Sequence, residues 1–289
     1  MDNSHGRILR LARRLSPRKS KQDTAAKVLF QPRQNYGSFR CKVRYHLLPF
    51  TAPKYCTKTR GFWFLGRMHY ITRKAFTQKP AEKPPVLLLL HGYGTDEHDL
   101  LPIADQIGTG FLIVSLQAPI ELPNGGHSWY DLLQTPSGII PDDFSRHESE
   151  EILLAALPNI ISQEGGDPEH VVLMGFSQGA AVVYSLLISR DLKKHGIVPL
   201  ASINMSGYIP RDIVESVPQR RFDKFPFFIC HGEYDELIPP QALDEAKELL
   251  TKQGANVTAR MQPCGHGVLP ETVEEIGIWL EKIMENKNA

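Results

Sequence analysis

The sequence predicts an α/β fold with a mostly parallel, doubly wound sheet that is flanked by helices. Two observations predict it. Short apolar runs that fit buried strands alternate along the chain with longer segments of helical apolar spacing. One such run, at 171–176, passes through Gly-Phe-Ser-Gln-Gly at 175–179 and resumes as an apolar helical segment. That order of strand, tight turn and helix is typical of a nucleophile elbow.

The expected elements can be placed in order from residue 69 onward. Residues 69–76 fit an edge strand, 78–85 a turn-rich connector, and 86–90 a buried strand. Thr95 is a suitable cap for a helix whose apolar positions continue to Ile107. The later predicted elements are a strand at 111–116, a long loop at 117–146, a helix at 148–162 bent at Pro158, a helix at 178–189, strands at 200–205 and 226–230, a helix at 241–252, a strand at 257–262 and a helix at 271–284. A loop as long as 117–146 is typically functional, so we expect it to shape the site.

Charge is divided unevenly along the chain. Residues 1–80 contain 19 Lys and Arg against 2 Asp, a net +17, whereas residues 81–289 contain the remaining 14 Lys and Arg against 30 Asp and Glu, a net −16. We therefore predict a basic, largely disordered extension over 1–67 and a folded domain over 68–289. Three other interpretations of the extension stay open. It could be a cleaved organellar targeting peptide, a basic arm with weak contact to an anionic membrane surface or nucleic acid, or upstream sequence outside the functional protein.

Composition narrows the class of protein. Apolar residues make up 42% of the chain and charged residues 22%, which is ordinary for a globular protein. The four cysteines lack metal-ligand spacing and are too few for a disulfide scaffold, so they favour the cytoplasm, with organelle import through 1–67 as the alternative. No apolar run approaches the roughly 18 residues of a membrane span. We expect no metal site, and no nucleic-acid binding by 68–289.

The elbow makes Ser177 the candidate nucleophile. So tight a turn requires a strained backbone at Ser177, while Gly175 and Gly179 leave room for the strand and the helix to approach closely. The turn raises the hydroxyl above the sheet and directs the helix N-terminus at a bound group. An activated serine also needs a base within hydrogen-bond reach and an acid that orients the base.

Loops after two later strands supply the candidate acid and base. Asp235 follows the strand at 226–230 and begins a D-x-x-I-P pattern before a helix, and His266 lies between two glycines after the strand at 257–262. The order Ser, Asp, His along the chain is the one found in α/β-hydrolases. Asp235 could instead cap a turn.

Other carboxylates and imidazoles lie near Asp235 and His266 in the sequence. Glu233 and Glu236 are rival acids on the Asp235 loop, whereas His266 is the only histidine that follows Asp235 in the sequence. His231 and His91 end strands, and we expect each to support the structure around the site.

An oxyanion hole needs two backbone N–H groups. We assign one to Gln178, directly after the nucleophile, and the other to Tyr93 in the glycine-rich loop 91–94. Because both residues would act through the backbone, their side chains would be free to line the pocket, and Tyr93 is also a candidate substrate-binding residue.

Five motifs together resemble one family. They are Leu-Leu-His-Gly-Tyr-Gly at 89–94, His-Ser-Trp-Tyr-Asp at 127–131, Gly-Phe-Ser-Gln-Gly at 175–179, the loop 231–239 and Gly-His-Gly at 265–267. From about Met68 to the C-terminus, the chain resembles the phospholipase/carboxylesterase family of serine hydrolases, which includes acyl-protein thioesterases.

The resemblance implies the α/β-hydrolase fold, the same triad and oxyanion donors, and hydrolysis of short- to medium-chain carboxylic esters, thioesters or lysophospholipids. It implies no cofactor, and family members occur as monomers and homodimers. It places Trp129 beside the acyl site, where it could be a wall of the substrate pocket or a core anchor.

Two other functions stay open. A lactonase similar to dienelactone hydrolases would use the same fold, although those enzymes carry Cys at the elbow and this chain carries Ser177. A binding protein that keeps the hydrolase fold without turnover is the second, and the intact set of Ser, Asp, His and oxyanion loop argues against it.

Overall fold

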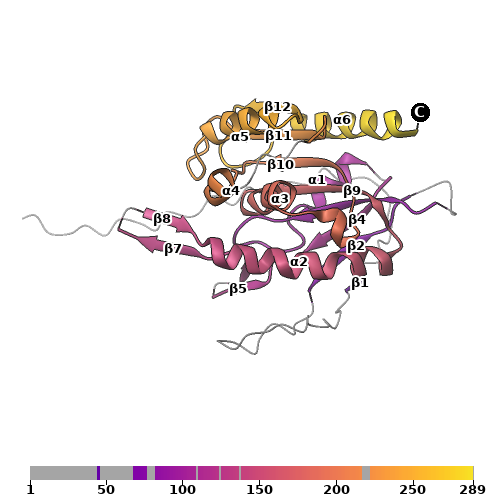
Figure 1. The fold of residues 1–289 in the computed structure, drawn as a ribbon, viewed down its shortest axis with the longest axis horizontal. Coiled ribbons are helices and arrows are strands. Elements are labelled where there is room, and N and C mark those ends of the chain that lie inside the picture. The colour runs from indigo at the N-terminus through magenta and orange to yellow at the C-terminus, as the bar shows by residue number, and fades with distance from the viewer. Residues whose placement is uncertain are drawn as a thin grey trace, which may run out of the picture. The chain divides into compact units, whose positions relative to one another are not determined.

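A mixed sheet organises the fold, with helices on both of its faces (Figure 1). The computed structural model describes residues 44–45, 68–76, 82–108, 110–123, 125–136, 138–216 and 222–288. Within these residues the sheet has eight strands in the order β1-β2-β4-β3-β9-β10-β11-β12. Their bounds are β1 Arg44–Tyr45, β2 Tyr70–Arg73, β3 Pro85–Leu90, β4 Leu112–Leu116, β9 Asp167–Phe176, β10 Pro199–Met205, β11 Pro226–Gly232 and β12 Asn256–Gln262.

All pairings from β4 to β12 are parallel, and only β1 and β2 run antiparallel to their neighbours. The helices are α1 Leu101–Ile107, α2 Asp143–Glu164, α3 Gln178–Ser189, a 3-10 turn η1 Leu192–His195, α4 Arg211–Ser216, α5 Gln241–Lys252 and α6 Pro270–Asn288. The predicted mostly parallel, doubly wound sheet is therefore confirmed.

Each face of the sheet carries its own apolar core because successive side chains of a strand point to opposite faces. In β3, Leu88 and Leu90 pack with apolar side chains of α2, α3 and α5. Leu87 and Leu89 pack on the other face, with α1 and α6. The sheet is therefore buried on both sides, and its reactive groups are left to the loops at the carboxyl ends of its strands.

Several predicted elements have different limits in the structure. Strand β2 covers only part of 69–76 and is not an edge, because β1 pairs with its outer side. Helix α1 begins at Leu101, with Pro102 in its first turn, where proline is favoured. Thr95 does not cap it, because the Thr95 hydroxyl donates to the carbonyl of Gly92 (3.0 Å) and to Asp99 Oδ2 (3.2 Å) within the preceding turn.

Other differences concern α2 and the segment before it. Helix α2 starts earlier than predicted, because Asp142 caps it by accepting the N–H groups of Phe144 and Ser145, and it continues through Pro158. The segment 117–146 contains two hairpins, β5 (Ile120–Leu122) with β6 (Gly126–Ser128) and β7 (Leu132–Thr135) with β8 (Gly138–Pro141). The short helices η1 and α4 were not predicted, since neither is long enough to show a helical period.

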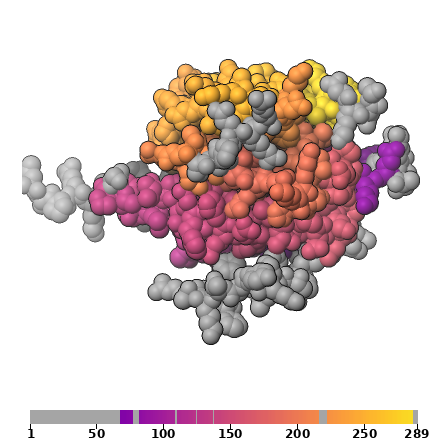
Figure 2. Space-filling view, viewed as in Figure 1, coloured from indigo at the N-terminus to yellow at the C-terminus, as the bar shows by residue number. Residues whose placement is uncertain are grey.

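The β7–β8 hairpin projects from the body of the domain, at the left of Figures 1 and 2. Leu132, Leu133, Ile139 and Ile140 are all exposed on it. Leu133 pairs with Ile140 across the strands, so it points to the face opposite Leu132. Both faces of the hairpin are therefore apolar, and alternation between buried and exposed positions, the usual signal of a strand, is missing.

The basic extension predicted at 1–67 lies outside the described residues, apart from the two residues of β1. Within the part of the chain that the structure describes, no helix combines the length and the apolar character needed to cross a bilayer.

A buried ionic cluster joins α2, α3 and α4. The guanidinium of Arg146, which is 1% exposed, donates to Glu150 Oε1, Ser185 Oγ and Asp212 Oδ2, each at 2.5 Å. Arg190 donates to the second oxygen of Glu150 at 3.0 Å. The cluster fixes α4, and with it the chain that leaves the carboxyl end of β10.

Replacing Arg146 by Met is expected to lower the free energy of unfolding by about 3–5 kcal/mol, because it removes the cation that Glu150 and Asp212 share in the interior. Urea denaturation measures this loss. Arg211→Met is the matched control, since Arg211 is 90% exposed and pairs with Glu215 on the surface. The control should leave the urea midpoint unchanged, and an equal shift in both variants would contradict a special role for the buried cluster.

Candidate active site

Ser177 lies in the turn between β9 and α3, with φ 52° and ψ −115°. A Cβ on Gly175 would come within 2.6 Å of the Ala180 nitrogen, and one on Gly179 within 2.1 Å of the Leu90 carbonyl oxygen. Only glycine fits at either position. The Ser177 N–H donates to the carbonyl of Met205 at 2.9 Å, which ties the turn to the end of β10.

The structure brings the three predicted side chains into one hydrogen-bonded line. His266 Nε2 lies 2.8 Å from Ser177 Oγ, and His266 Nδ1 lies 2.7 Å from Asp235 Oδ2. The three residues come from the loops after β9, β11 and β12. In the sheet β10 lies between β9 and β11, and β12 is next to β11. With Nδ1 protonated, Nε2 is free to accept the Ser177 proton.

Asp235 is buried and held as a carboxylate. Its Oδ1 accepts the N–H groups of Leu237 (2.9 Å) and Ile238 (3.0 Å), and its Oδ2 faces His266 and also His231 Nε2 at 3.1 Å. Burial raises the pKa of Asp235, but the hydrogen bonds from Ile238, His266 and Leu237 together outweigh it and leave the pKa below its ordinary value. The rival acids Glu233 and Glu236 are exposed on the same loop.

One predicted oxyanion donor, Gln178, follows the nucleophile in the chain. The other, Tyr93, is next in the chain to Gly92, which lies close to Ser177. Gln178 is the first residue of α3, and a Cβ on Gly92, beside Tyr93, would be 3.5 Å from Ser177 Cβ. Among the described residues, the N–H groups of Tyr93 and Gln178 have no hydrogen-bond partner. Gln178 stands at the start of α3, where the first N–H groups of a helix have no partner within the helix.

This geometry agrees with the comparison to known families. A family model described as Phospholipase/Carboxylesterase matches residues 72–284, from β2 to α6. The chain belongs to the phospholipase/carboxylesterase family. The resemblance seen in the five sequence motifs is thereby confirmed, and the protein is a carboxylic ester hydrolase with the α/β-hydrolase fold.

Individual relatives agree with this assignment. The chain is 30% identical over 196 residues to acyl-protein thioesterase 1 of Gibberella zeae, covering 65% of this chain and 78% of the relative. It is 24% identical over 229 residues to acyl-protein thioesterase 1 homolog 1 of Dictyostelium discoideum, covering 74% and 97%. The crystal structure of the Bacillus cereus carboxylesterase superposes with a TM-score of 0.64 at 26% identity, covering 75% of this chain and 94% of that one.

The Gln178 side chain is not free to line a pocket, contrary to our expectation. It is only 4% exposed. Its Oε1 accepts the N–H of Trp129 at 2.7 Å, and its Nε2 donates to the carbonyl of Tyr130 at 2.7 Å. In this family member the residue after the nucleophile therefore binds the His-Ser-Trp-Tyr-Asp segment through its side chain. Tyr93, by contrast, is half exposed.

Trp129 lies in the core. Its side chain is 0% exposed, and its indole N–H donates to the carbonyl of His91 at 2.9 Å. The indole ring also lies 5.5 Å from the His91 ring, between centroids. Of the two roles considered for Trp129, its burial agrees with the core anchor and leaves no surface for a substrate wall.

His91 is hydrogen-bonded to the glycine-rich loop 91–94 as a neutral ring. Its Nε2 accepts the N–H of Ala118 at 3.0 Å, so the proton is on Nδ1, which donates to the carbonyl of Gly92 at 2.7 Å. Burial lowers the pKa of His91 and outweighs the opposing effect of its bond to Gly92. The ring thus bridges the ends of β3 and β4 without facing the nucleophile.

The lowered pKa of His91 predicts a pH effect on stability. Below about pH 6.5 the unfolded chain binds a proton at His91 that the folded chain does not, so the free energy of unfolding should fall as the pH drops. Urea denaturation at several pH values between about 7.5 and 5.5 measures this slope. His91→Gln should flatten it, and His98→Gln, at an exposed position, should not. Equal slopes in the wild type and His91→Gln would contradict the assignment.

Two residues near the triad were missed by sequence analysis. The Phe176 ring lies 5.0 Å from the His266 ring, between centroids, and so packs beside the base. Ser206, directly after β10, also has positive φ (48°), and its hydroxyl donates to the carbonyl of Gly267, the residue after His266, at 3.1 Å. The Ser-Gly pair directly after β10 was the available signal, since the residues that follow a parallel strand of this sheet lie at the edge where the site is.

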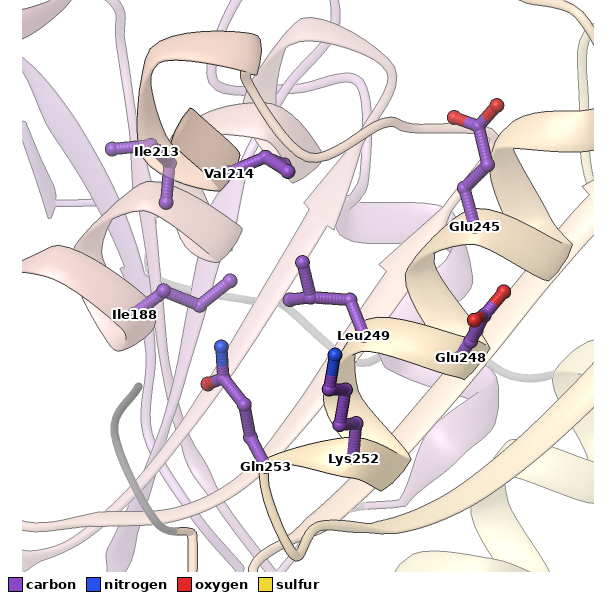
Figure 3. Close-up of a pocket in the computed structure, with 8 residues that line it drawn as sticks. All are labelled: Ile188, Ile213, Val214, Glu245, Glu248, Leu249, Lys252 and Gln253. Carbon is purple, nitrogen blue, oxygen red and sulfur yellow. The ribbon is translucent and has the colours of Figure 1, made fainter. Parts of the chain in front are cut away.

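A separate hollow of about 340 Å³ lies where α3, α4 and α5 meet (Figure 3). Ile188, Ile213 and Leu249 face it, and Glu245 and Glu248 stand along its α5 side. Ile188 lies eleven residues along α3 from Ser177, which is about 16 Å at 1.5 Å per residue. The hollow is therefore distinct from the triad.

Proposed function

We propose that this protein is a serine esterase that hydrolyses short- to medium-chain carboxylic esters and thioesters through an acyl-enzyme on Ser177. The observation that carries the proposal is the continuous line from Ser177 Oγ through His266 to Asp235, with distances of 2.8 and 2.7 Å. The proposed roles are nucleophile for Ser177, general base and acid for His266, and orienting acid for Asp235.

Acylation begins when His266 Nε2 accepts the hydroxyl proton of Ser177 and Oγ attacks the substrate carbonyl carbon. The developing oxyanion receives hydrogen bonds from the N–H groups of Tyr93 and Gln178. Asp235 stabilises the imidazolium through Nδ1–H. When the tetrahedral intermediate collapses, the alkoxide or thiolate leaves with the proton from Nε2, and the acyl group stays on Oγ.

Deacylation repeats these steps with water. His266 Nε2 takes a proton from a water molecule, the hydroxide adds to the acyl carbon, and the same two N–H groups stabilise the second oxyanion. Collapse expels Ser177 Oγ, which recovers its proton from His266, and the carboxylic acid is released. Every proton and acyl transfer uses protein groups and water, so the proposed mechanism requires no cofactor or metal.

The substrate class rests on the relatives and on the loops around the triad. Relatives are named as acyl-protein thioesterases and as carboxylesterases, so both leaving groups are proposed. The loops that carry Tyr93 and Asp235 expose apolar side chains, among them Tyr234 and Leu237, which is 74% exposed. Such a surface suits an uncharged acyl chain.

Two measurements test this function. Wild-type enzyme is given p-nitrophenyl esters from acetate to palmitate and the matching acyl thioesters, and kcat/KM is expected to peak at short or middle chain length in both series. Mass spectrometry of the enzyme quenched during turnover should find one acyl group, on the peptide that contains Ser177. Turnover without an acyl-enzyme, or acylation of another residue, would reject the mechanism. Activity confined to lactones would support the alternative lactonase.

A further inference from the structure

The two proposed oxyanion donors are held together by a third segment of chain, residues 126–130, which we call the strap. One end of the strap binds the loop after β3. The Gly94 N–H donates to the carbonyl of His127, and the His127 N–H donates to the carbonyl of Thr95, both at 2.8 Å. A Cβ on Gly126 would lie 2.3 Å from the Gly94 carbonyl oxygen, so the strap and the loop are in direct backbone contact.

The other end of the strap binds the residue after the nucleophile. Gln178 accepts from the Trp129 N–H and donates to the Tyr130 carbonyl, both at 2.7 Å. Trp129 also reaches back through its indole N–H to the His91 carbonyl at 2.9 Å. Trp129 is therefore bonded to both segments that supply an oxyanion donor, and its own carbonyl is held by the Ser149 hydroxyl on α2.

Tyr93 and Gln178 lie on different strand–loop units, so the distance between their N–H groups depends on contacts between the units. These contacts are the direct packing of Gly179 against the end of β3 and the hydrogen bonds of the strap. An oxyanion hole works only when both N–H groups lie within about 2.7–3.1 Å of one oxygen position. Buried hydrogen bonds between fixed partners restrict movement strongly, and His91, Trp129 and Gln178 are all buried. The strap is thus linked to Gln178 by two hydrogen bonds of the Gln178 side chain. It is linked to His91 by one hydrogen bond from the Trp129 indole N–H.

We propose that Trp129 is a positioning residue for catalysis, which sets the spacing of the Tyr93 and Gln178 N–H groups without touching the substrate. The inference rests on the proposed function. In the same way, the Gln178 side chain positions the donor that its own backbone supplies. A core anchor alone would contribute to folding, whereas a positioning residue contributes specifically to stabilisation of the oxyanion.

The test uses Trp129→Phe, which keeps an aromatic ring and removes the indole N–H, and Gln178→Met, which keeps the backbone N–H and the side-chain length. Trp279→Phe is the matched control, because Trp279 also packs against an aromatic ring, Phe228 on the sheet, but lies on α6. Active sites are counted with a fluorophosphonate, so that any loss of folded enzyme is separated from a loss of rate. Ser177→Ala is assayed beside them.

We expect Trp129→Phe and Gln178→Met each to lower kcat about 10- to 100-fold per active site, with KM changed less than about threefold. Binding of a trifluoromethyl ketone, whose adduct with serine carries an oxyanion, should weaken by the same factor as kcat/KM. The double variant should lose less than the product of the single losses, since both changes break one chain of contacts. Trp279→Phe should match the wild type in kcat and inhibitor binding.

Each other result has a definite meaning. If Trp129→Phe has normal kcat per active site and only a lower melting temperature, Trp129 is a core anchor and the inference fails while the esterase function stands. A higher KM with unchanged kcat would also overturn the inference. If Ser177→Ala is as active as the wild type, the proposed function fails, and the positioning role fails with it. Should Trp129→Phe not fold, Gln178→Met decides by the same readouts.

Discussion

Ser177→Ala is expected to lower kcat about 10⁴- to 10⁶-fold while the fold is kept. The substitution removes the only atom that attacks the substrate, and the remaining groups of the site can only bind and polarise the carbonyl. The backbone of the elbow is held by contacts that alanine preserves, namely the Ser177 N–H to the Met205 carbonyl and the close packing at Gly175 and Gly179. Circular dichroism and thermal melting should therefore match the wild type.

A second serine in the same environment controls for the backbone strain. Ser206 is buried, has φ 48° and lies at the end of the neighbouring strand, but its hydroxyl faces the Gly267 carbonyl. Loss of one neutral hydrogen bond is worth about 1 kcal/mol, so Ser206→Ala should lose less than about tenfold in kcat. If Ser206→Ala were as inactive as Ser177→Ala, the assay would be reporting damage to this edge of the sheet instead of loss of the nucleophile.

The carboxyl edge of the sheet was predictable because its central strands are buried on both faces. The predicted runs at 86–90, 111–116 and 200–205 agree with β3, β4 and β10 to within one residue at each end, and helices α3 and α5 have their predicted bounds. A short, continuous apolar run that is bounded by Gly or Pro is typical of a buried strand. Since the sheet is parallel, the loops that follow its strands had to meet at one edge, and this placed Ser177, Asp235 and His266 together before any distance was known.

The features that sequence analysis did not predict depend on side-chain contacts, and these contacts leave no periodic pattern in the sequence. The exposed β7–β8 hairpin shows no alternation, and the start of α1 was set by Pro102 and by local bonds of Thr95. The role of the strap was equally hidden, because it depends on which way the Gln178 amide and the Trp129 indole point. Sequence could place Gln178 beside the nucleophile, but it could not show that its side chain is buried.

Asp235→Asn should lower kcat about 10⁴-fold, and the contacts of Asp235 explain why the loss is so large. Oδ1 accepts two backbone N–H groups, from Leu237 and Ile238. In the variant this position holds the amide oxygen, because the two backbone N–H groups keep their protons, whereas the His266 imidazole at the other position can change tautomer. The NH₂ is therefore turned toward His266 Nδ1, which must lose its proton in order to accept. The proton moves to Nε2, and a protonated Nε2 cannot accept from Ser177.

The variant should fold, since Asn keeps the shape of Asp and the His231 N–H keeps the Ile238 carbonyl as its partner at 3.0 Å. Steady-state kinetics with a p-nitrophenyl ester gives kcat, and Glu233→Gln and Glu236→Gln on the same loop control for the lost charge. Because both of these side chains are exposed and lie outside the line from Asp235 to Ser177, each should keep kcat within about twofold of the wild type. A large loss in Glu233→Gln or Glu236→Gln, with Asp235→Asn still active, would move the orienting role to that glutamate. Full activity in all three would mean that His266 is oriented by its packing against Phe176 instead of by a carboxylate.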